Sequence, residues 1–269
     1  MTATKTNGPP PGRADEQAPV LVLLHGGGPG VDARGNWATV RPALSASFRC
    51  LAPDLLGFGT QVTTGEAGGV TPLGPRAWAR ARARQILSLL DRQGLRRVHL
   101  LGNSAAGGAA ALALMAEAPE RVDRAVLMGG AGTGPPPARV PFYEEPTAES
   151  MRATLARLVA DETPHRDLLD ELAPRRLEQA LRPGAEAAFR AMFAEPPPGG
   201  PPPVDPAGVR TPVLALHGER DRVSPVEVSE RLAEALPNGR LRVVAGAGHW
   251  IHVDRPDEFC ELVGEFLSA

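Results

Sequence analysis

The stretch L-G-N-S-A-A-G-G at residues 101–108 decides the fold. It joins an apolar run at 98–101 to a helix-forming run that ends at Glu117. A serine among small residues, placed where a strand turns into a helix, has two interpretations. It is either a nucleophile elbow, a sharp turn that exposes the hydroxyl, or an ordinary turn whose serine caps the helix. The rest of the sequence has to decide between them.

Short apolar runs alternate with helical patterns on both sides of this stretch. We expect strands at residues 20–24, 48–52, 98–101, 125–128, 213–216 and 241–244. We expect helices at residues 36–47, 76–93, 105–117, 226–235 and 256–267. The run V-L-V-L-L at 20–24 is uniformly apolar, as in a strand that is buried on both faces. This alternation predicts an α/β fold with a mostly parallel central sheet flanked by helices.

The interval 132–208 interrupts the alternation. It opens with G-T-G-P-P-P, closes near P-P-P-G-G-P-P-P, and contains helical patterns at 147–162 and 167–194 without a convincing strand. Proline-rich hinges around a helical block predict an inserted lid; a disordered insertion is the alternative, and the regular apolar spacing argues against it. The expected parts are a flexible leader at 1–18, a core at 19–132 and 209–269, and a helical lid at 133–208.

Composition excludes several classes of protein. The 29 basic and 31 acidic residues leave a net charge of -2, and no basic block indicates nucleic-acid binding. Cys50 and Cys260 lack the spacing of a metal site, which favours inert thiols in a reducing compartment. No apolar run is long enough to span a membrane, and the first residues do not look like a secretory signal. We expect a cytoplasmic protein without a metal, a nucleic-acid partner or a membrane partner.

A serine hydroxyl needs a base and a carboxylate that orients the base. Asp221 follows the expected strand at 213–216, and His249 follows the expected strand at 241–244. Parallel strands end at one edge of their sheet, so both side chains are expected beside Ser104. The plain alternatives are a helix-capping Asp221 and a solvated His249. The order serine, acid, histidine favours a catalytic triad, with Ser104 as nucleophile, His249 as base and Asp221 as its orienting acid.

The loop after the first expected strand reads H-G-G-G-P-G at residues 25–30. Glycines let a backbone approach a substrate oxygen closely. We predict an oxyanion hole made of the N–H groups of Gly27 and Ala105, the residue after the nucleophile. The competing interpretation is a phosphate-binding loop, but neither G-x-G-x-x-G nor G-x-x-x-x-G-K-[ST] spacing is present.

On these motifs the chain resembles the α/β hydrolases. More narrowly, it resembles the meta-cleavage product hydrolases, which cut carbon–carbon bonds in vinylogous 1,5-diketones from aromatic ring cleavage. The resemblance rests on H-G-G-G-P-G at 25–30, G-N-S at 102–104, G-x-x-D-R at 218–222 and G-H-W at 248–250, and it covers residue 19 onward. It implies a cofactor-free hydrolase that acts on a small-molecule dienoate and forms a homodimer.

The resemblance also implies substrate-binding residues. Asn36, Asn103 and Trp250 match positions near the dienoate end of the substrate. The segment D-E-L-A-P-R-R-L-E at 170–178 matches one that holds a carboxylate-binding arginine, best placed at Arg176. Arg175 is its neighbour, and a solvated helix face is the plain alternative for both. A guanidinium in a dry cleft binds a carboxylate through two hydrogen bonds, which suits this role.

The chain departs from the family pattern in places that bear on the substrate. Ala105 and Ala106 replace the usual methionine and glycine, and Leu56 replaces a proline. The expected lid holds few aromatic residues: Phe142, Tyr143, Phe189 and Phe193. The same triad would serve an esterase, a lactonase or a cyclisation catalyst, which is the alternative function. A non-catalytic receptor with a hydrolase fold is the alternative from another class.

Overall fold

The computed structural model describes residues 18–62, 72–131, 142–195, 198–200 and 202–269. Its centre is a six-stranded sheet with the order β2-β1-β3-β4-β5-β6, in which every pairing is parallel. The strands are β1 (Val20–Leu24), β2 (Arg49–Leu51), β3 (Val98–Asn103), β4 (Val122–Met128), β5 (Val213–Gly218) and β6 (Gly239–Val244). The predicted α/β fold with a parallel central sheet is confirmed.

From β1 the chain first adds β2 on one side of the sheet and then adds all later strands on the other side, so β1 is the point where the strand order reverses. This strand pairs with β2 on one side and with β3 on the other, so the loops that leave β1 and β3 diverge. Ligands of open α/β sheets bind in the crevice that opens at such a point. The loop after β1 is the glycine loop at residues 25–30, and the turn after β3 begins at Ser104.

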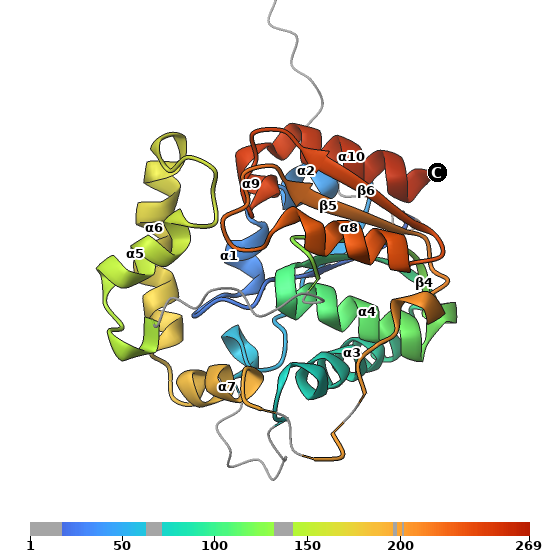
Figure 1. Cartoon of the computed structure of the whole chain (residues 1–269), viewed down its shortest axis with the longest axis horizontal. Coiled ribbons are helices and arrows are strands. Elements are labelled where there is room, and N and C mark those ends of the chain that lie inside the picture. The colour runs from blue at the N-terminus through green and yellow to red at the C-terminus, as the bar shows by residue number, and fades with distance from the viewer. Residues whose placement is uncertain (1–17, 63–71, 132–141, 196–197, 201) are drawn as a thin grey trace, which may run out of the picture.

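Helices cover both faces of the sheet (Figure 1). One face packs against α3 (Pro75–Arg92), α4 (Ala109–Glu117) and α8 (Val226–Ala235). The other packs against α1 (Ala33–Trp37), α2 (Arg41–Leu44) and α10 (Pro256–Ser268). The first layer includes buried alanines of α4, whose small side chains let that helix lie close to the sheet. A core poor in aromatic residues is thereby closely packed.

Two expected helices of the core are wrong in detail. The helix expected at 36–47 is two short helices, because Asp32 caps α1 and Pro42 lies in the first turn of α2, where its missing N–H is tolerated. The helix expected at 105–117 begins only at Ala109. A single wide π-type turn, Ser104–Gly108, precedes it. The other helices and strands of the core agree with expectation to within three residues at each end.

Between β4 and β5 the chain forms α5 (Ala148–Ala156), α6 (Arg166–Ala180) and α7 (Ala185–Met192). The helix expected at 167–194 is divided at Pro183 and Gly184, and Gly184 adopts a left-handed conformation with φ of 85°. In Figure 1, α5 and α6 lie beside the core and α7 lies near α3. We call residues 142–195 the inserted segment. Residues 1–17 of the expected leader and residues 133–141, 196–197 and 201 of the expected lid lie outside the described residues.

Two further observations bear on the excluded classes. No helix in the described part of the chain is both long and apolar enough to cross a membrane. Cys50 and Cys260 are free thiols, and both are half-buried. Burial raises the pKa of Cys260 to about 11, so this thiol stays protonated and unreactive near neutral pH.

Candidate active site

Ser104 lies on a strained turn at the end of β3. Its φ angle is 54°, a left-handed conformation that non-glycine residues adopt rarely. The neighbouring glycines are needed for space: a Cβ at Gly102 would lie 2.9 Å from the Gly107 carbonyl oxygen, and one at Gly107 would overlap the carbonyl oxygen of Leu24. The Ser104 side chain makes no capping hydrogen bond to α4. The turn therefore has the geometry of an elbow that exposes its hydroxyl.

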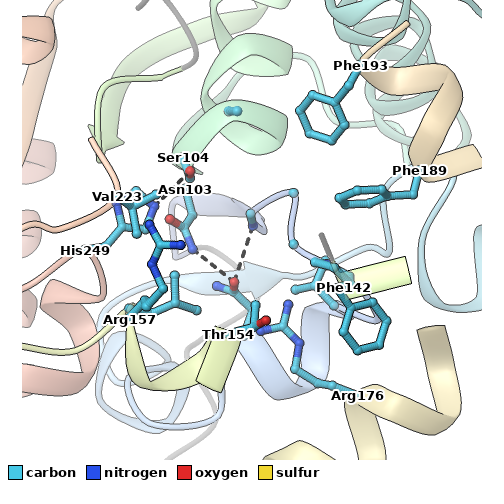
Figure 2. A pocket seen from close by; sticks show the side chains of 18 of the residues that line it. Asn103, Ser104, Phe142, Thr154, Arg157, Arg176, Phe189, Phe193, Val223 and His249 are labelled. Carbon is cyan, nitrogen blue, oxygen red and sulfur yellow. Dashed lines mark hydrogen bonds between the residues drawn. The ribbon is translucent and has the colours of Figure 1, made fainter. Parts of the chain in front are cut away.

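The three residues predicted as a triad are in hydrogen-bond contact. Nε2 of His249 lies 2.9 Å from Oγ of Ser104 (Figure 2), and Nδ1 of His249 lies 2.7 Å from Oδ2 of Asp221. If Nδ1 carries the proton and donates it to the carboxylate, Nε2 is left free to accept the serine proton. His249 and the Asp221 carboxyl group are both buried.

The Asp221 carboxylate is stabilised in its charged form. Its other oxygen accepts hydrogen bonds from the backbone N–H groups of Val223 at 2.7 Å and Ser224 at 2.9 Å. Burial acts to raise the pKa of Asp221, but the hydrogen bond and charge of His249 and the two backbone donors together lower it below its usual range. The acid therefore remains ionised and holds the imidazole of His249 in place.

A glycine that we did not single out from the sequence makes room for His249. Gly129 leaves β4 with φ of 71°, and a Cβ there would lie 2.6 Å from Cε1 of the imidazole. Any larger residue would displace the ring. The signal in the sequence was the G-G pair directly after an apolar strand, where two glycines mark a backbone with left-handed angles.

The glycine loop borders the same cavity as Ser104. Gly27 and Ala105, the predicted oxyanion donors, both line it. The ring of His25 holds the loop: Nδ1 donates to the Gly26 carbonyl at 2.8 Å, and Nε2 accepts from the Leu55 N–H at 2.9 Å. A Cβ at Gly27 would lie 3.2 Å from that of Ala106, so a side chain there would crowd the turn after the serine. The donor roles of Gly27 and Ala105 stay a prediction.

Asn36 and Asn103 form a buried amide pair beside Ser104. Nδ2 of Asn103 donates to Oδ1 of Asn36 at 3.0 Å, and the Gly26 N–H donates to the same oxygen at 3.3 Å (Figure 2). Nδ2 of Asn36 and Oδ1 of Asn103 are buried and have no partner among the described residues. Because an unpaired buried donor and acceptor cost free energy, this pair is suited to bind a polar ligand in the cavity that both residues line.

Arg176 reaches the cavity from α6 over the glycine loop. Its side chain is only 8% exposed, and Nε is buried without a partner among the described residues. A Cβ at Gly30 would overlap the Arg176 carbonyl oxygen, so this glycine lets helix and loop approach each other. Burial lowers the pKa of Arg176 to about 10, and the guanidinium lies 5.8 Å from the ring of Trp250. A cation in this position is suited to bind a ligand anion.

Its neighbour Arg175 lies differently. Arg175 is exposed on α6 and pairs with Glu171 at 3.3 Å, as expected for a solvated helix face. The structure therefore distinguishes the two arginines that the sequence left side by side. Trp250, the other residue expected near the dienoate end, is buried and lines the same cavity as Arg176.

The cavity has a volume of about 300 Å³. All four aromatic residues of the expected lid line it: Phe142, Tyr143, Phe189 and Phe193. Figure 2 shows three of these rings on one side of the cavity, with His249 and Val223 on the other. The scarcity of aromatic residues in the inserted segment therefore does not leave the cavity without an aromatic wall.

The inserted segment is joined to the loop that carries His249. The Trp250 N–H donates to the Leu158 carbonyl at 2.6 Å, and Arg222 donates to the carbonyls of Ala156 and Val159, each at 2.8 Å. Asp254 accepts hydrogen bonds from the N–H groups of Gly248 and Ala160. The end of α5 and the histidine loop are therefore held together.

His252, three residues after His249 in the sequence, has partners away from the triad. Its Nε2 donates to the backbone carbonyl of Asn36 at 2.9 Å, and its ring packs against Trp37 and Phe259. Burial lowers the pKa of His252 to about 4, so the ring stays neutral. This histidine supports the backbone of Asn36 and has no contact with Ser104.

Comparison with known proteins agrees with this geometry. Residues 21–262 match the model of the Alpha/beta hydrolase family. The chain is 38% identical over 259 residues to the 2-hydroxy-6-oxo-2,4-heptadienoate hydrolase of Pseudomonas putida, which spans 93% of this chain and 89% of that protein. It is 35% identical over 260 residues to a 2-hydroxymuconate semialdehyde hydrolase of a Pseudomonas species, across 92% of this chain and 86% of the relative.

Solved structures give the same result. The 2-hydroxy-6-oxo-6-phenylhexa-2,4-dienoate hydrolase of a Rhodococcus species superposes with a TM-score of 0.81 at 32% identity, covering 95% of this chain and 92% of that one. Fold, strand order and sequence likeness lead to one assignment. The chain belongs to the alpha/beta hydrolase family, and within that family it is similar to the meta-cleavage product hydrolases.

Proposed function

We propose that the protein is a serine-dependent hydrolase that cleaves a carbon–carbon bond in a vinylogous diketone of the dienoate type. The observation that carries this proposal is the 2.9 Å contact between Ser104 Oγ and His249 Nε2, in the same cavity as the buried cation of Arg176. A nucleophile with a base accounts for hydrolysis, and an unpaired buried cation accounts for a substrate with a carboxylate. The names of the relatives, which are dienoate and semialdehyde hydrolases, support the same substrate class.

Substrate binding precedes the chemistry. The substrate carboxylate accepts hydrogen bonds from Arg176, and the amides of Asn36 and Asn103 bind the neighbouring oxygen atoms. In this position the dienol becomes its keto tautomer, as one proton leaves the enol oxygen and one is added to the far carbon of the diene. Arg176, Asn103 and Trp250 assist that step by orienting the dienoate end.

The cleavage step uses the triad. Ser104 Oγ attacks the ketone carbon and its proton passes to His249 Nε2, while the N–H groups of Gly27 and Ala105 stabilise the oxyanion. When the carbon–carbon bond breaks, its electron pair goes to the dienoate fragment, which takes a proton. One water molecule then releases the acyl group from Ser104. The products are an enol acid and a carboxylic acid.

The inserted segment has a place in this proposal. We assign residues 133–208 as a helical lid over a core made of residues 19–132 and 209–269, with residues 1–18 as a leader. The lid supplies Arg176 and the aromatic wall, so it determines substrate class, whereas the core supplies the triad. We also propose that the protein is a homodimer in the cytoplasm.

The test uses a yellow dienoate ring-fission product. The purified protein should bleach its visible absorbance, and Ser104→Ala should not. A fluorophosphonate should label the wild type and leave Ser104→Ala unlabelled. Cleavage of simple esters without bleaching of several dienoate analogues would favour the esterase alternative. Equal labelling of both proteins would overturn the role of Ser104.

A further inference from the structure

A second arginine that the proposed mechanism does not use lines the same cavity. Arg157 directly follows α5, and its side chain borders the cavity together with Val223 and His249. Figure 2 shows it on the side of His249 and Val223, with Phe142, Phe189 and Phe193 on the other side. Arg190 also lines the cavity but is paired with Glu186, so Arg157 and Arg176 are the two lining arginines without a carboxylate partner among the described residues.

The backbone around Arg157 is fixed from both sides. The carbonyls of Ala156 and Val159 accept hydrogen bonds from Arg222, and the carbonyl of Leu158 accepts one from the Trp250 N–H. A Cβ at Gly248 would lie 2.6 Å from the Ala160 nitrogen, so the histidine loop and this segment are in close contact. The backbone at Arg157 is therefore held in a fixed position close to the triad. A fixed backbone lowers the entropic cost of ordering a long side chain on binding.

Neighbouring arginines of the inserted segment are paired, whereas Arg157 is not. Arg152 contacts Glu162 and Asp170, and Arg190 contacts Glu186. Among the described residues, no hydrogen bond or ion pair is made by the Arg157 side chain. Glu144 lines the cavity as well, but it forms no ion pair with Arg157. A cavity-lining cation that has no carboxylate partner among the described residues is available to an anion of the ligand.

The two cations lie over different strands. Arg176 sits over the glycine loop, which leaves β1, while Arg157 lies on the same side of the cavity as Val223, which follows β5. Ser104 leaves β3, and the strand order places β3 between β1 and β5. The ends of β1 and β5 are three strand spacings apart, roughly 14 Å. An extended substrate that is anchored at Arg176 and reacts at Ser104 therefore continues toward Arg157.

We propose that Arg157 binds a second carboxylate of the substrate, on the far side of the cleaved bond from the carboxylate bound by Arg176. The preferred substrate is accordingly a diacid, a dienoate whose ketone side chain ends in a carboxylate. This inference rests on the proposed function and specifies its substrate. Cleavage adds one water molecule, and the fragment attached to Ser104 leaves as a dicarboxylic acid.

The experiment compares two dienoate ring-fission products with the same side chain beyond the ketone. One side chain ends in a carboxylate and the other in the neutral primary amide. Wild type should favour the diacid in kcat/KM. Arg157→Met should reduce kcat/KM for the diacid roughly 10- to 100-fold, the range for a lost charge-assisted hydrogen bond, and change that for the amide by less than about threefold. Arg157→Lys, which keeps the charge, should retain part of the preference.

A binding measurement separates recognition from chemistry. In the Ser104→Ala background, the visible spectrum of the bound dienoate gives dissociation constants for both ligands. Adding Arg157→Met should weaken only the binding of the diacid. The matched control is Arg84→Met, at an exposed arginine of α3 that does not line the cavity, which should leave the binding of both ligands unaffected.

The outcomes distinguish the two proposals. If wild type cleaves neither dienoate, the proposed function fails. If wild type cleaves both equally well, or if Arg157→Met reduces activity on both by the same factor, the diacid proposal is overturned while carbon–carbon hydrolysis stands. Thermal unfolding of Arg157→Met, compared with wild type, shows that the variant is folded under the assay conditions.

Discussion

Nε2 of His217 lies 3.4 Å from Oδ2 of Asp221, the same oxygen that Nδ1 of His249 contacts at 2.7 Å. His217 is fully buried in β5, donates from Nε2 to the Ser224 carbonyl at 3.0 Å, and accepts at Nδ1 from the Ser229 hydroxyl at 2.7 Å. Burial lowers its pKa, so the ring is neutral at physiological pH. His217 thus braces the loop that carries the acid, and His249 is the closer partner of the carboxylate.

Replacing His217 should affect catalysis through the position of Asp221. His217→Ala removes the partner of the Ser224 carbonyl, and a shift of the acid loop by a fraction of an ångström should lower kcat roughly 10-fold with little change in KM. His217→Gln keeps a donor and should recover part of the loss. Steady-state kinetics across pH check this; equal losses for both variants would contradict it.

Asp221→Asn should lower kcat by roughly 10³- to 10⁴-fold, because an amide cannot hold His249 in the tautomer that frees Nε2. The fold should remain, since the backbone donors of Val223 and Ser224 keep an oxygen acceptor. Burst kinetics with an activated ester measure the acylation step. Asp123→Asn, at an ion pair with Arg97 on the surface, is the control and should retain wild-type activity.

Arg176→Met should reduce kcat/KM mainly for substrates with a carboxylate at the dienoate end, roughly 10- to 100-fold. A neutral ester of similar size should be hydrolysed nearly as well as by wild type, since it makes no ion pair in that position. Arg175→Met, at the exposed neighbouring residue, should change neither rate. Equal loss on the neutral ester would contradict carboxylate binding by Arg176.

Gly107→Ala should unfold or strongly destabilise the protein. The added methyl group would overlap the carbonyl oxygen of Leu24 and lie 2.8 Å from that of His25, so β1 and the serine turn would have to separate. Gly264→Ala is the matched control, because nothing lies within 4 Å of its added methyl and the site is inside α10. It should stabilise the protein by about 0.5–1 kcal/mol. Chemical denaturation measures both; a destabilised Gly264→Ala would be unexpected.

Stability should decline as the pH falls below about 6.5. Burial lowers the pKa of His25 and of His252 to about 4, from a normal value of 6.5. Between these values the unfolded chain binds protons that the folded chain does not, so the free energy of unfolding rises with pH across that window. His252→Gln should make the dependence shallower, since one of the histidines with a lowered pKa is gone. An unchanged slope in urea titrations from pH 4 to 6.5 would contradict this.

Part of this architecture was readable from the sequence because its signals are local. The uniformly apolar run of β1 and the amphipathic pattern of α8 gave the observed bounds of both elements. The proximity of Ser104, Asp221 and His249 could be predicted because each follows its own strand, and parallel strands all end at the same edge of the sheet.

Other features depend on contacts between distant segments and have no local signal. The position of Arg157 results from hydrogen bonds with Arg222 and Trp250, which lie more than sixty residues away in the sequence. The choice of Arg176 over Arg175 depends on which face of α6 meets the glycine loop, and α6 has only a weak apolar stripe. The break between α1 and α2 follows from Pro42, which is best tolerated in the first turn of a helix, so the chain begins a new helix there.

The hydrogen bond from the Trp250 N–H to the Leu158 carbonyl has a mechanical consequence. Together with the hydrogen bonds of Arg222 and Asp254, it ties residues 156–160 to the loop that carries His249, so a displacement of one is expected to displace the other. An outward displacement of residues 156–160 would move His249 away from Ser104, and without its base the hydroxyl would not act as a nucleophile. Such a displacement would leave the protein unreactive toward other esters and ketones until the segment returned to the position seen in this structure.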